Sequence, residues 1–281
     1  MKLDAGTFLL QLAAGGLFFG WVTTRRREVS LGYGWLLRSV YGALAIGAFA
    51  LFVANSHTAA AVFAAGCAIA SAGALTVSVA RRRAGVRGRE EVRAARRARV
   101  AAMLGRVEEE AEKRGDPEYP PILDLIAALI GFAGLFAAAQ FAGGPYALAA
   151  ARLIVGAAFL GSVTDAMLLG HWYLVQPGLP RDAVRELVVW TALMWPLEIF
   201  VFLWPTGMVQ VINGTIDDGY QGVLGWIWIA CAVTTIFLVV LTWFALKERS
   251  YSAVMAATGL LYLAILTAFG TDLIARAVLK P

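Results

Sequence analysis

Residues 223–246 read VLGWIWIACAVTTIFLVVLTWFAL, a long apolar run without a charged side chain. At about 1.5 Å per residue, a helix of this length crosses a hydrocarbon core of about 30 Å. Further runs of similar character occupy residues 5–23, 36–54, 58–80, 122–142, 146–170, 184–205 and 252–275. Because backbone hydrogen bonds must close within each segment in lipid, these runs are predicted to be helices rather than strands.

The composition of the whole chain agrees with this interpretation. Of its 281 residues, 60% are hydrophobic and only 15% are charged, and the mean hydropathy is +0.71. A chain this apolar cannot cover a water-facing surface with polar groups, so lipid must be its main solvent. We predict an all-α fold: a polytopic membrane protein with a bundle of about eight transmembrane helices, forming a single transmembrane domain over residues 1–281.

The first apolar run could be mistaken for a signal peptide. However, Asp4 precedes the run, a convincing small-x-small cleavage site is missing, and Arg25, Arg26 and Arg27 follow at once. We therefore interpret residues 5–23 as a retained first span.

Basic residues set the expected orientation, because Lys and Arg near span ends resist translocation. With eight spans, one side of the membrane receives Arg25 to Arg27, Arg81 to Arg83, Arg181, Arg185, Lys247 and Arg249. This side is predicted to be the cytoplasm, with both termini outside, and Arg276 and Lys280 are exceptions at the outer end. The abundance of Ala, Gly and Arg indicates a GC-rich genome and favours a bacterial cytoplasmic (inner) membrane.

Residues 81–121 form the one extended polar segment, inserted between the third and fourth spans. Val100, Met103, Leu104 and Val107 recur at helical spacing, which predicts an amphipathic cytoplasmic helix followed by a loop. Its arginine-rich first half is expected to bind anionic lipid headgroups rather than nucleic acid. The apolar stripe is expected to dock on the inner face of this protein or on a partner protein.

Ionisable residues inside the spans are the candidate functional residues, since each costs roughly 2.5–3.5 kcal/mol at a span centre. Arg152 lies about 9 Å below the outer end of the fifth run, and Glu198 lies about 10 Å below the outer end of the sixth. We therefore predict a buried ion pair between Arg152 and Glu198, beside a kink at Pro196. The pair serves either as a clasp between two helices or as part of a transport site.

Asp165 is the third costly residue, about 10 Å from the inner aromatic belt at Trp172 and Tyr173. Two interpretations remain open for its carboxyl group. It is either a protonated group bonded to a neighbouring helix or a proton relay or cation ligand.

The two histidines are predicted to lie on opposite sides of the membrane, His57 in an outer loop and His171 at the inner headgroup level. They cannot jointly bind a haem, and we expect no metal site. The segment from His171 to Arg181 places aromatic and hydrogen-bonding groups where a quinone or lipid headgroup would lie. Asp165 and His171 are therefore candidate cofactor-binding residues, with interfacial anchoring as the alternative role for His171.

Motifs for phosphate binding, zinc hydrolysis and nucleophilic catalysis are missing, and no internal repeat is apparent. The sequence therefore favours a non-enzymatic protein, either a subunit of a larger membrane complex or a small transporter built around Arg152, Asp165 and Glu198. The alternative is a quinone- or lipid-handling protein with a site near the cytoplasmic interface, for which quinone is the candidate cofactor. Expected partners are membrane lipid and complex subunits, but not nucleic acid.

Overall fold

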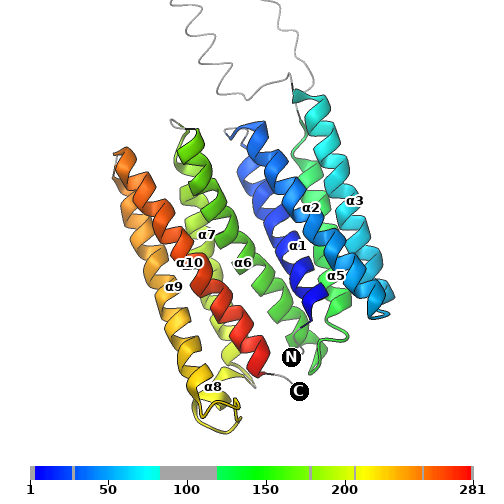
Figure 1. Ribbon diagram of the computed structural model, residues 1–281, viewed down its shortest axis with the longest axis vertical. Helices are drawn as coiled ribbons and strands as arrows, with labels where there is room; N and C mark the ends of the chain where they lie inside the picture. The colour runs from blue at the N-terminus through cyan, green and yellow to red at the C-terminus, as the bar shows by residue number, and fades with distance from the viewer. Residues whose placement is uncertain are drawn as a thin grey trace, which may run out of the picture.

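The computed structural model describes residues 4–26, 29–82, 119–176, 179–205, 207–248 and 250–279. Most of these residues are helical, and no strand occurs within the described ranges (Figure 1). The helices are α1 (Ala5–Thr24), α2 (Leu31–Ala54), α3 (Thr58–Ala80), α5 (Ile122–Ala138), α6 (Tyr146–Val175), α7 (Asp182–Leu203), α8 (Met208–Ile212), α9 (Val223–Lys247) and α10 (Tyr251–Val278). The predicted all-α membrane bundle is confirmed.

Seven of the described helices are long and apolar enough to cross a membrane. The remaining predicted span corresponds to α5, which has 17 residues and ends at Ala138 instead of residue 142. Gly143 and Gly144 both adopt positive φ, at 83° and 77°, and Pro145 follows them, so the chain turns there toward α6. Although short, α5 packs against α1 and α3 and is therefore part of the bundle.

The bundle consists of two units of four helices each. In the first unit, α1, α2, α3 and α5 form a closed ring in which each helix contacts the next, and α5 returns to α1. In the second unit, α6, α7, α9 and α10 form a ring in the same order. Both units are visible in Figure 1, and α1 of the first lies beside α6 of the second at the centre of the bundle. The two units thus share one helix order, although the two halves of the sequence do not align.

The two units join where α1 crosses α6 at backbone contact distance. A Cβ atom on Gly15 would lie 1.9 Å from the carbonyl oxygen of Ala157, and one on Gly161 would lie 2.3 Å from the carbonyl carbon of Gly15. Only glycine permits this approach, as in small-residue contacts between membrane helices generally. The close seam brings polar side chains from both units within reach of one another.

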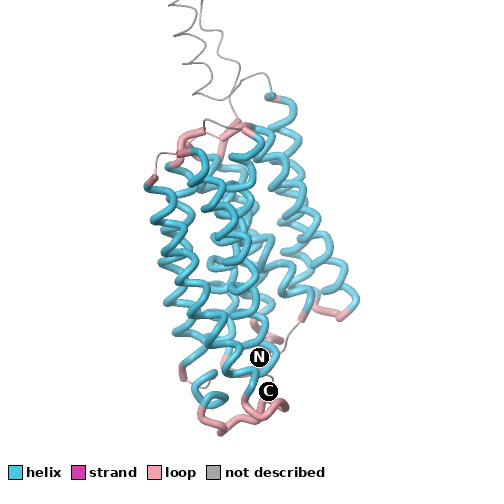
Figure 2. The backbone as a smooth tube through the Cα atoms, turned by 60° about the vertical axis from the view of Figure 1, so that its left-hand side comes forward, coloured by secondary structure: helices cyan, strands magenta, loops and turns pink. Residues whose placement is uncertain are grey.

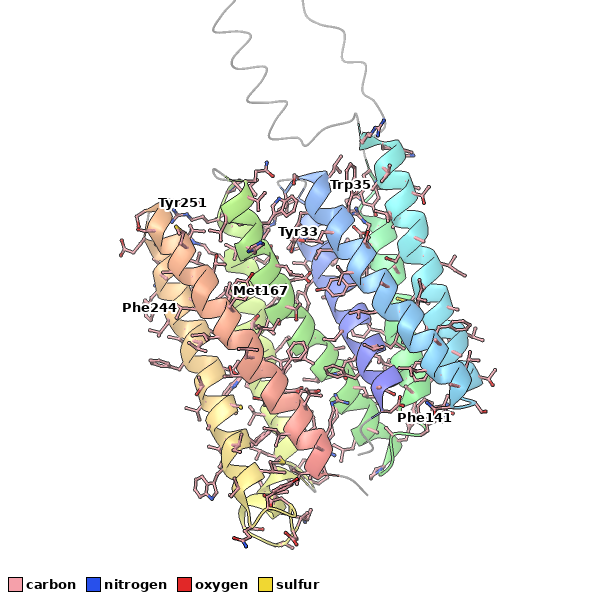
Figure 3. All side chains as sticks on the ribbon, in the orientation of Figure 1. Tyr33, Trp35, Phe141, Met167, Phe244 and Tyr251 are labelled. Carbon is pink, nitrogen blue, oxygen red and sulfur yellow. The ribbon has the colours of Figure 1, made fainter. Side chains whose placement is uncertain are left out.

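Large apolar side chains cover the outside of the bundle, as lipid requires. Ile69, Leu266 and Trp226 are exposed by 73%, 70% and 67%. Phe244 and Tyr251, labelled in Figure 3, project from the outer faces of α9 and α10. Charged and polar side chains such as Arg38, Asp165 and Glu198 are buried instead. Apolar side chains on the surface and polar side chains in the interior agree with a membrane environment.

Loops lie at the two ends of the bundle (Figure 2), and polar groups there complete the helix termini. Arg181 donates to the carbonyl of Ser250 at 3.0 Å, and Arg185 donates to that of Leu246 at 2.6 Å. At the other end, Asp218 accepts backbone N–H groups of Tyr220, Gly222 and Leu224, each at 2.8 Å. Loss of hydration opposes ionisation of Asp218, but these hydrogen bonds prevail and hold its pKa below the usual value.

The predicted cytoplasmic helix of residues 81–121 lies almost entirely outside the described residues. Arg81, Arg82, Tyr119, Pro120 and Pro121 are its described members. The helix therefore stays a prediction.

The α1–α6 seam can be tested with a single methyl group. We expect Gly15→Ala to lower the free energy of unfolding by about 3 kcal/mol or more, because the backbones of α1 and α6 must separate. Gly73→Ala in α3 is the control, since a Cβ atom there meets nothing within 4 Å. Thermal unfolding in detergent measures both effects. Equal melting temperatures for the two variants would contradict the close backbone contact between α1 and α6.

Candidate functional site

Buried and half-buried polar side chains form three clusters beside α1. The outer cluster comprises Gln11, Arg152, Glu198, Asp272 and Arg276, the middle cluster comprises Asp165, Tyr33 and Tyr41, and the inner cluster comprises Thr24, Arg38, Ser78, Tyr119 and Asp124. Here "outer" denotes the end of the bundle at which α1 begins and α10 ends. Each cluster combines residues from at least two helices, so none is visible as a local sequence motif.

The outer cluster contains an ion pair within α10. Arg276 Nε donates to Asp272 Oδ2 at 2.7 Å, and both side chains are buried. Gln11 of α1 approaches the other carboxyl oxygen, with Nε2 lying 3.5 Å from Asp272 Oδ1. Arg276 also approaches the carbonyl oxygen of Arg152 in α6 at 3.4 Å. The cluster therefore links α10 to the first helix of each unit.

Arg152 and Glu198, the predicted ion pair, both belong to this cluster. Arg152 Nε donates to the carbonyl oxygen of Val201 at 2.8 Å, and its guanidinium lies over the ring of Phe202, 5.5 Å from the centroid. Arg152 and Glu198 are near enough to interact electrostatically. A direct hydrogen-bonded ion pair between them stays a prediction, because the contact described for Arg152 Nε is with α7 backbone. The helix α7 continues through Pro196.

Glu198 is the least satisfied polar residue of the cluster. It is fully buried, and neither carboxyl oxygen receives a hydrogen bond from any described donor. Its neighbours include the Asp272 carboxyl and the guanidinium groups of Arg276 and Arg152. Glu198 is thus a buried carboxyl group that lies near a second carboxyl and two guanidinium groups but accepts no hydrogen bond from the described residues.

Gly156 of α6 provides the space that this cluster occupies. A Cβ atom on Gly156 would lie 2.3 Å from Gln11 Nε2, 2.9 Å from Asp272 Oδ1 and 3.0 Å from Arg276 Nη2. Four charged groups and one amide thus meet at the junction of the two units. With two guanidinium and two carboxyl groups, the cluster is electrically balanced when all four are ionised.

The middle cluster surrounds Asp165, which is fully buried in α6. Tyr41 of α2 donates to Asp165 Oδ1, and Tyr33 of α2 donates to the backbone carbonyl of Asp165 at 3.3 Å. Figure 3 shows Tyr33 between α2 and α6. A Cβ atom on Gly16 would lie 2.0 Å from the Tyr41 ring, so glycine at this position admits the tyrosine. Asp165 Oδ2 has no hydrogen-bond partner among the described residues.

The inner cluster is centred on a bidentate ion pair. Arg38 Nε and Nη2 donate to the two oxygens of Asp124, both at 2.7 Å. Tyr119 and Thr24 donate to the same carboxylate at 2.8 and 3.1 Å, and Arg38 Nη1 donates to Ser78 at 3.1 Å. Burial and the negative charge of Asp124 raise the pKa of Tyr119, which keeps its hydroxyl proton available for this contact. This cluster is fully satisfied, as stable buried ion pairs must be.

His171 and Asp165, the candidate cofactor-binding residues, are not brought together. His171 is exposed near the inner end of α6, and its Nδ1 lies 3.1 Å from the hydroxyl of Tyr262 in α10. Asp165 instead contacts tyrosines of α2 inside the bundle. His57 stacks on Phe141 at the outer end, with 3.6 Å between ring centroids. The described residues contain no group of three or more His, Cys, Asp or Glu side chains that could hold a metal ion.

Sequence reasoning missed Arg38, Asp124 and Asp272 because each lies within a turn or two of the end of a predicted span. At such a position a charged side chain is expected to reach water. Arg276 is an exception to the positive-inside rule in the sequence, and the structure buries its side chain within the bundle. A signal was available in the Asp272–Arg276 spacing, because residues four apart face one another on a helix.

The Arg38–Asp124 pair should be essential for stability. Arg38→Met leaves the Asp124 carboxylate buried without its cation, and we expect the free energy of unfolding to fall by about 3–5 kcal/mol. The double variant Arg38→Met/Asp124→Leu should recover much of this loss, because no uncompensated charge remains. Thermal unfolding in detergent provides the measurement. A double variant no more stable than Arg38→Met would show that the two side chains are not coupled.

Comparisons of the chain with protein-family models, curated proteins and solved structures found no match.

Proposed function

We propose that the protein is a small transporter that moves protons across a bacterial cytoplasmic membrane, either alone or as a subunit of a larger membrane complex. The buried Glu198 carboxyl group, which lacks hydrogen bonds from the described residues, carries this proposal. Glu198 is fully buried and receives no hydrogen bond from the described part of the chain, although it lies beside a second carboxyl. A purely structural clasp would satisfy its carboxyl oxygens, as the Arg38–Asp124 pair does.

The depths of the three clusters support a path through the bundle. Gln11, Arg152 and Asp272 lie six residues from the outer ends of their helices, and Glu198 lies five residues from the end of α7. Asp165 lies ten residues before the inner end of α6, or about 15 Å from it. Asp124 lies in the first turn of α5 at the inner end. Carboxyl groups thus occur at successive levels of the membrane.

The described basic residues support the expected orientation. The residues Arg25, Arg26, Arg81, Arg82, Arg181, Arg185 and Lys247 all lie at the end of the bundle where α1 finishes and α10 begins. By the positive-inside rule, this end faces the cytoplasm and both termini lie outside. Arg152 and Arg276 at the opposite end are buried in the outer cluster, so they do not count as loop charges.

The proposal predicts that Glu198→Gln strongly reduces proton flux while preserving the fold. Purified protein in liposomes would be given a potassium diffusion potential with valinomycin, and a trapped dye would report the internal pH. Wild-type protein should acidify the vesicles when the interior is negative. Glu198→Gln should lower the rate at least about tenfold, because the amide cannot release a proton.

Glu186→Gln is the matched control, since it is the same substitution in the same helix. Glu186 pairs with Arg25 and with Arg26, the latter at 2.9 Å, at the inner end of α7 and outside all three clusters. Flux through this variant should match the wild type. A wild-type rate equal to that of empty liposomes would refute proton transport by the isolated chain. Native mass spectrometry of gently released protein would then show whether partner subunits are missing.

A second candidate function rests on His171 and Tyr262. Both side chains are exposed, and the Tyr262 hydroxyl lies 3.1 Å from His171 Nδ1. His171 lies four residues before the inner end of α6, near the level where quinone rings and lipid headgroups lie. The candidate function is quinone or lipid handling with a site at the cytoplasmic interface.

His171→Ala tests this second candidate. Protein purified in mild detergent should retain quinone or phospholipid, and the variant should retain at least about tenfold less, because a positioned hydrogen bond is lost. Extraction followed by chromatography measures the bound amount. His57→Ala at the outer end is the control. Equal retention by His171→Ala and the wild type would exclude a site at His171.

A further inference from the structure

A small cavity lies between the middle and inner clusters. It is lined by Leu17, Gly20 and Thr24 of α1, by Gly34, Leu37 and Arg38 of α2, and by Asp124 of α5. Its volume is on the order of that needed for one water molecule. Its polar wall consists of Thr24, Arg38 and Asp124, which together offer both donors and acceptors.

Gly20 connects this cavity to Asp165. A Cβ atom on Gly20 would lie 3.8 Å from Asp165 Oδ2 and 3.2 Å from Leu37 Cδ1. Gly20 and Leu37 both line the cavity, so the space left by the missing side chain borders both the cavity and Asp165. The oxygen that faces this space is the one without a hydrogen-bond partner among the described residues, whereas Oδ1 is held by Tyr41.

Polar groups lie on both sides of the cavity and of the space beside Gly20. Asp165 is contacted from α2 by Tyr33 and Tyr41. Across the cavity, Asp124 Oδ2 accepts hydrogen bonds from Arg38 Nη2 at 2.7 Å and from Thr24 at 3.1 Å. A water molecule in the cavity would meet Thr24, Arg38 and Asp124 as polar partners, which satisfies its usual requirement. The space beside Gly20 leads from there toward Asp165 Oδ2.

We propose that this cavity binds a water molecule that passes protons between Asp165 and Asp124. The proposal rests on the proposed function, because it supplies the inner half of the proton path. Asp165 is the internal proton carrier, and Gly20 is the position that keeps the connection open. The site takes water and protons rather than a larger ligand, because of its size.

The transfer conserves every atom and charge. The O–H bond at Asp165 Oδ2 breaks, and that proton bonds to the water oxygen. A different O–H bond of the water breaks, and its proton bonds to Asp124 Oδ2. Asp124 becomes neutral, so its ion pair with Arg38 weakens until the proton leaves toward the inner solution. Release of the proton restores the ion pair, and Asp165 then accepts the next proton from the outer side.

Infrared spectroscopy of Gly20→Ala tests the site independently of transport. The band of the protonated Asp165 carboxyl is identified as the band that Asp165→Asn removes. On transfer to heavy water, this band shifts when the proton exchanges through the cavity. We expect Gly20→Ala to slow the exchange at least about tenfold, because the added methyl group excludes water from the gap. Proton flux in liposomes should fall by a similar factor.

Gly47→Ala is the matched control, because a Cβ atom there would also press on a flexible leucine of α1, at 3.1 Å from Leu9 Cδ1. It lies in the outer half of α2, away from the cavity, and should exchange at the wild-type rate. Melting temperatures of both variants establish that they fold. Failure of Asp165→Asn to remove a band, or equal exchange in Gly20→Ala and Gly47→Ala, would overturn the proposal. Slow exchange in Gly20→Ala without flux in the wild type would support the water site and refute proton transport.

Discussion

In hydrocarbon, a charged or polar side chain has no water to bind, so the protein itself must provide its partners. The buried polar groups of the bundle differ in how many partners the protein gives them. Arg38 and Asp124 satisfy one another completely, with Tyr119 and Thr24 completing the carboxylate shell. Such a pair fixes how α2 and α5 pack around α1. Because the Asp124 carboxylate has all its hydrogen bonds, the main role of the pair is to stabilise the fold.

Glu198 and Asp165 meet the same constraint only in part. Each is fully buried and each retains at least one carboxyl oxygen without a donor in the described ranges. Burying an ionisable side chain in a membrane span costs several kcal/mol of stability. In membrane proteins, buried carboxyl groups of this kind often belong to proton or ion pathways. The inner pair thus differs from these two residues, because its carboxylate is held by four donor groups whereas Glu198 and Asp165 each keep an oxygen without a described donor.

The helix α1 links packing to the candidate path. Its glycines allow three different approaches: Gly15 admits the backbone of α6, Gly16 admits the ring of Tyr41, and Gly20 leaves a space beside Asp165. The same helix contributes Gln11 to the outer cluster and Thr24 to the inner one. All three clusters therefore depend on the position of α1 between the two four-helix units.

The sequence by itself determined the class of fold, because the length and apolarity of each run are local properties that a single helix must have to cross lipid. It also identified Arg152, Asp165 and Glu198 as costly, since their depth follows from counting residues along one helix. Only the tertiary structure decided their partners. Asp272 and Arg276 join Glu198, and Tyr41 joins Asp165, through contacts between residues more than 70 positions apart. Such contacts depend on the packing order of the helices and on glycines that permit close approach, and neither is encoded in the periodicity of one segment.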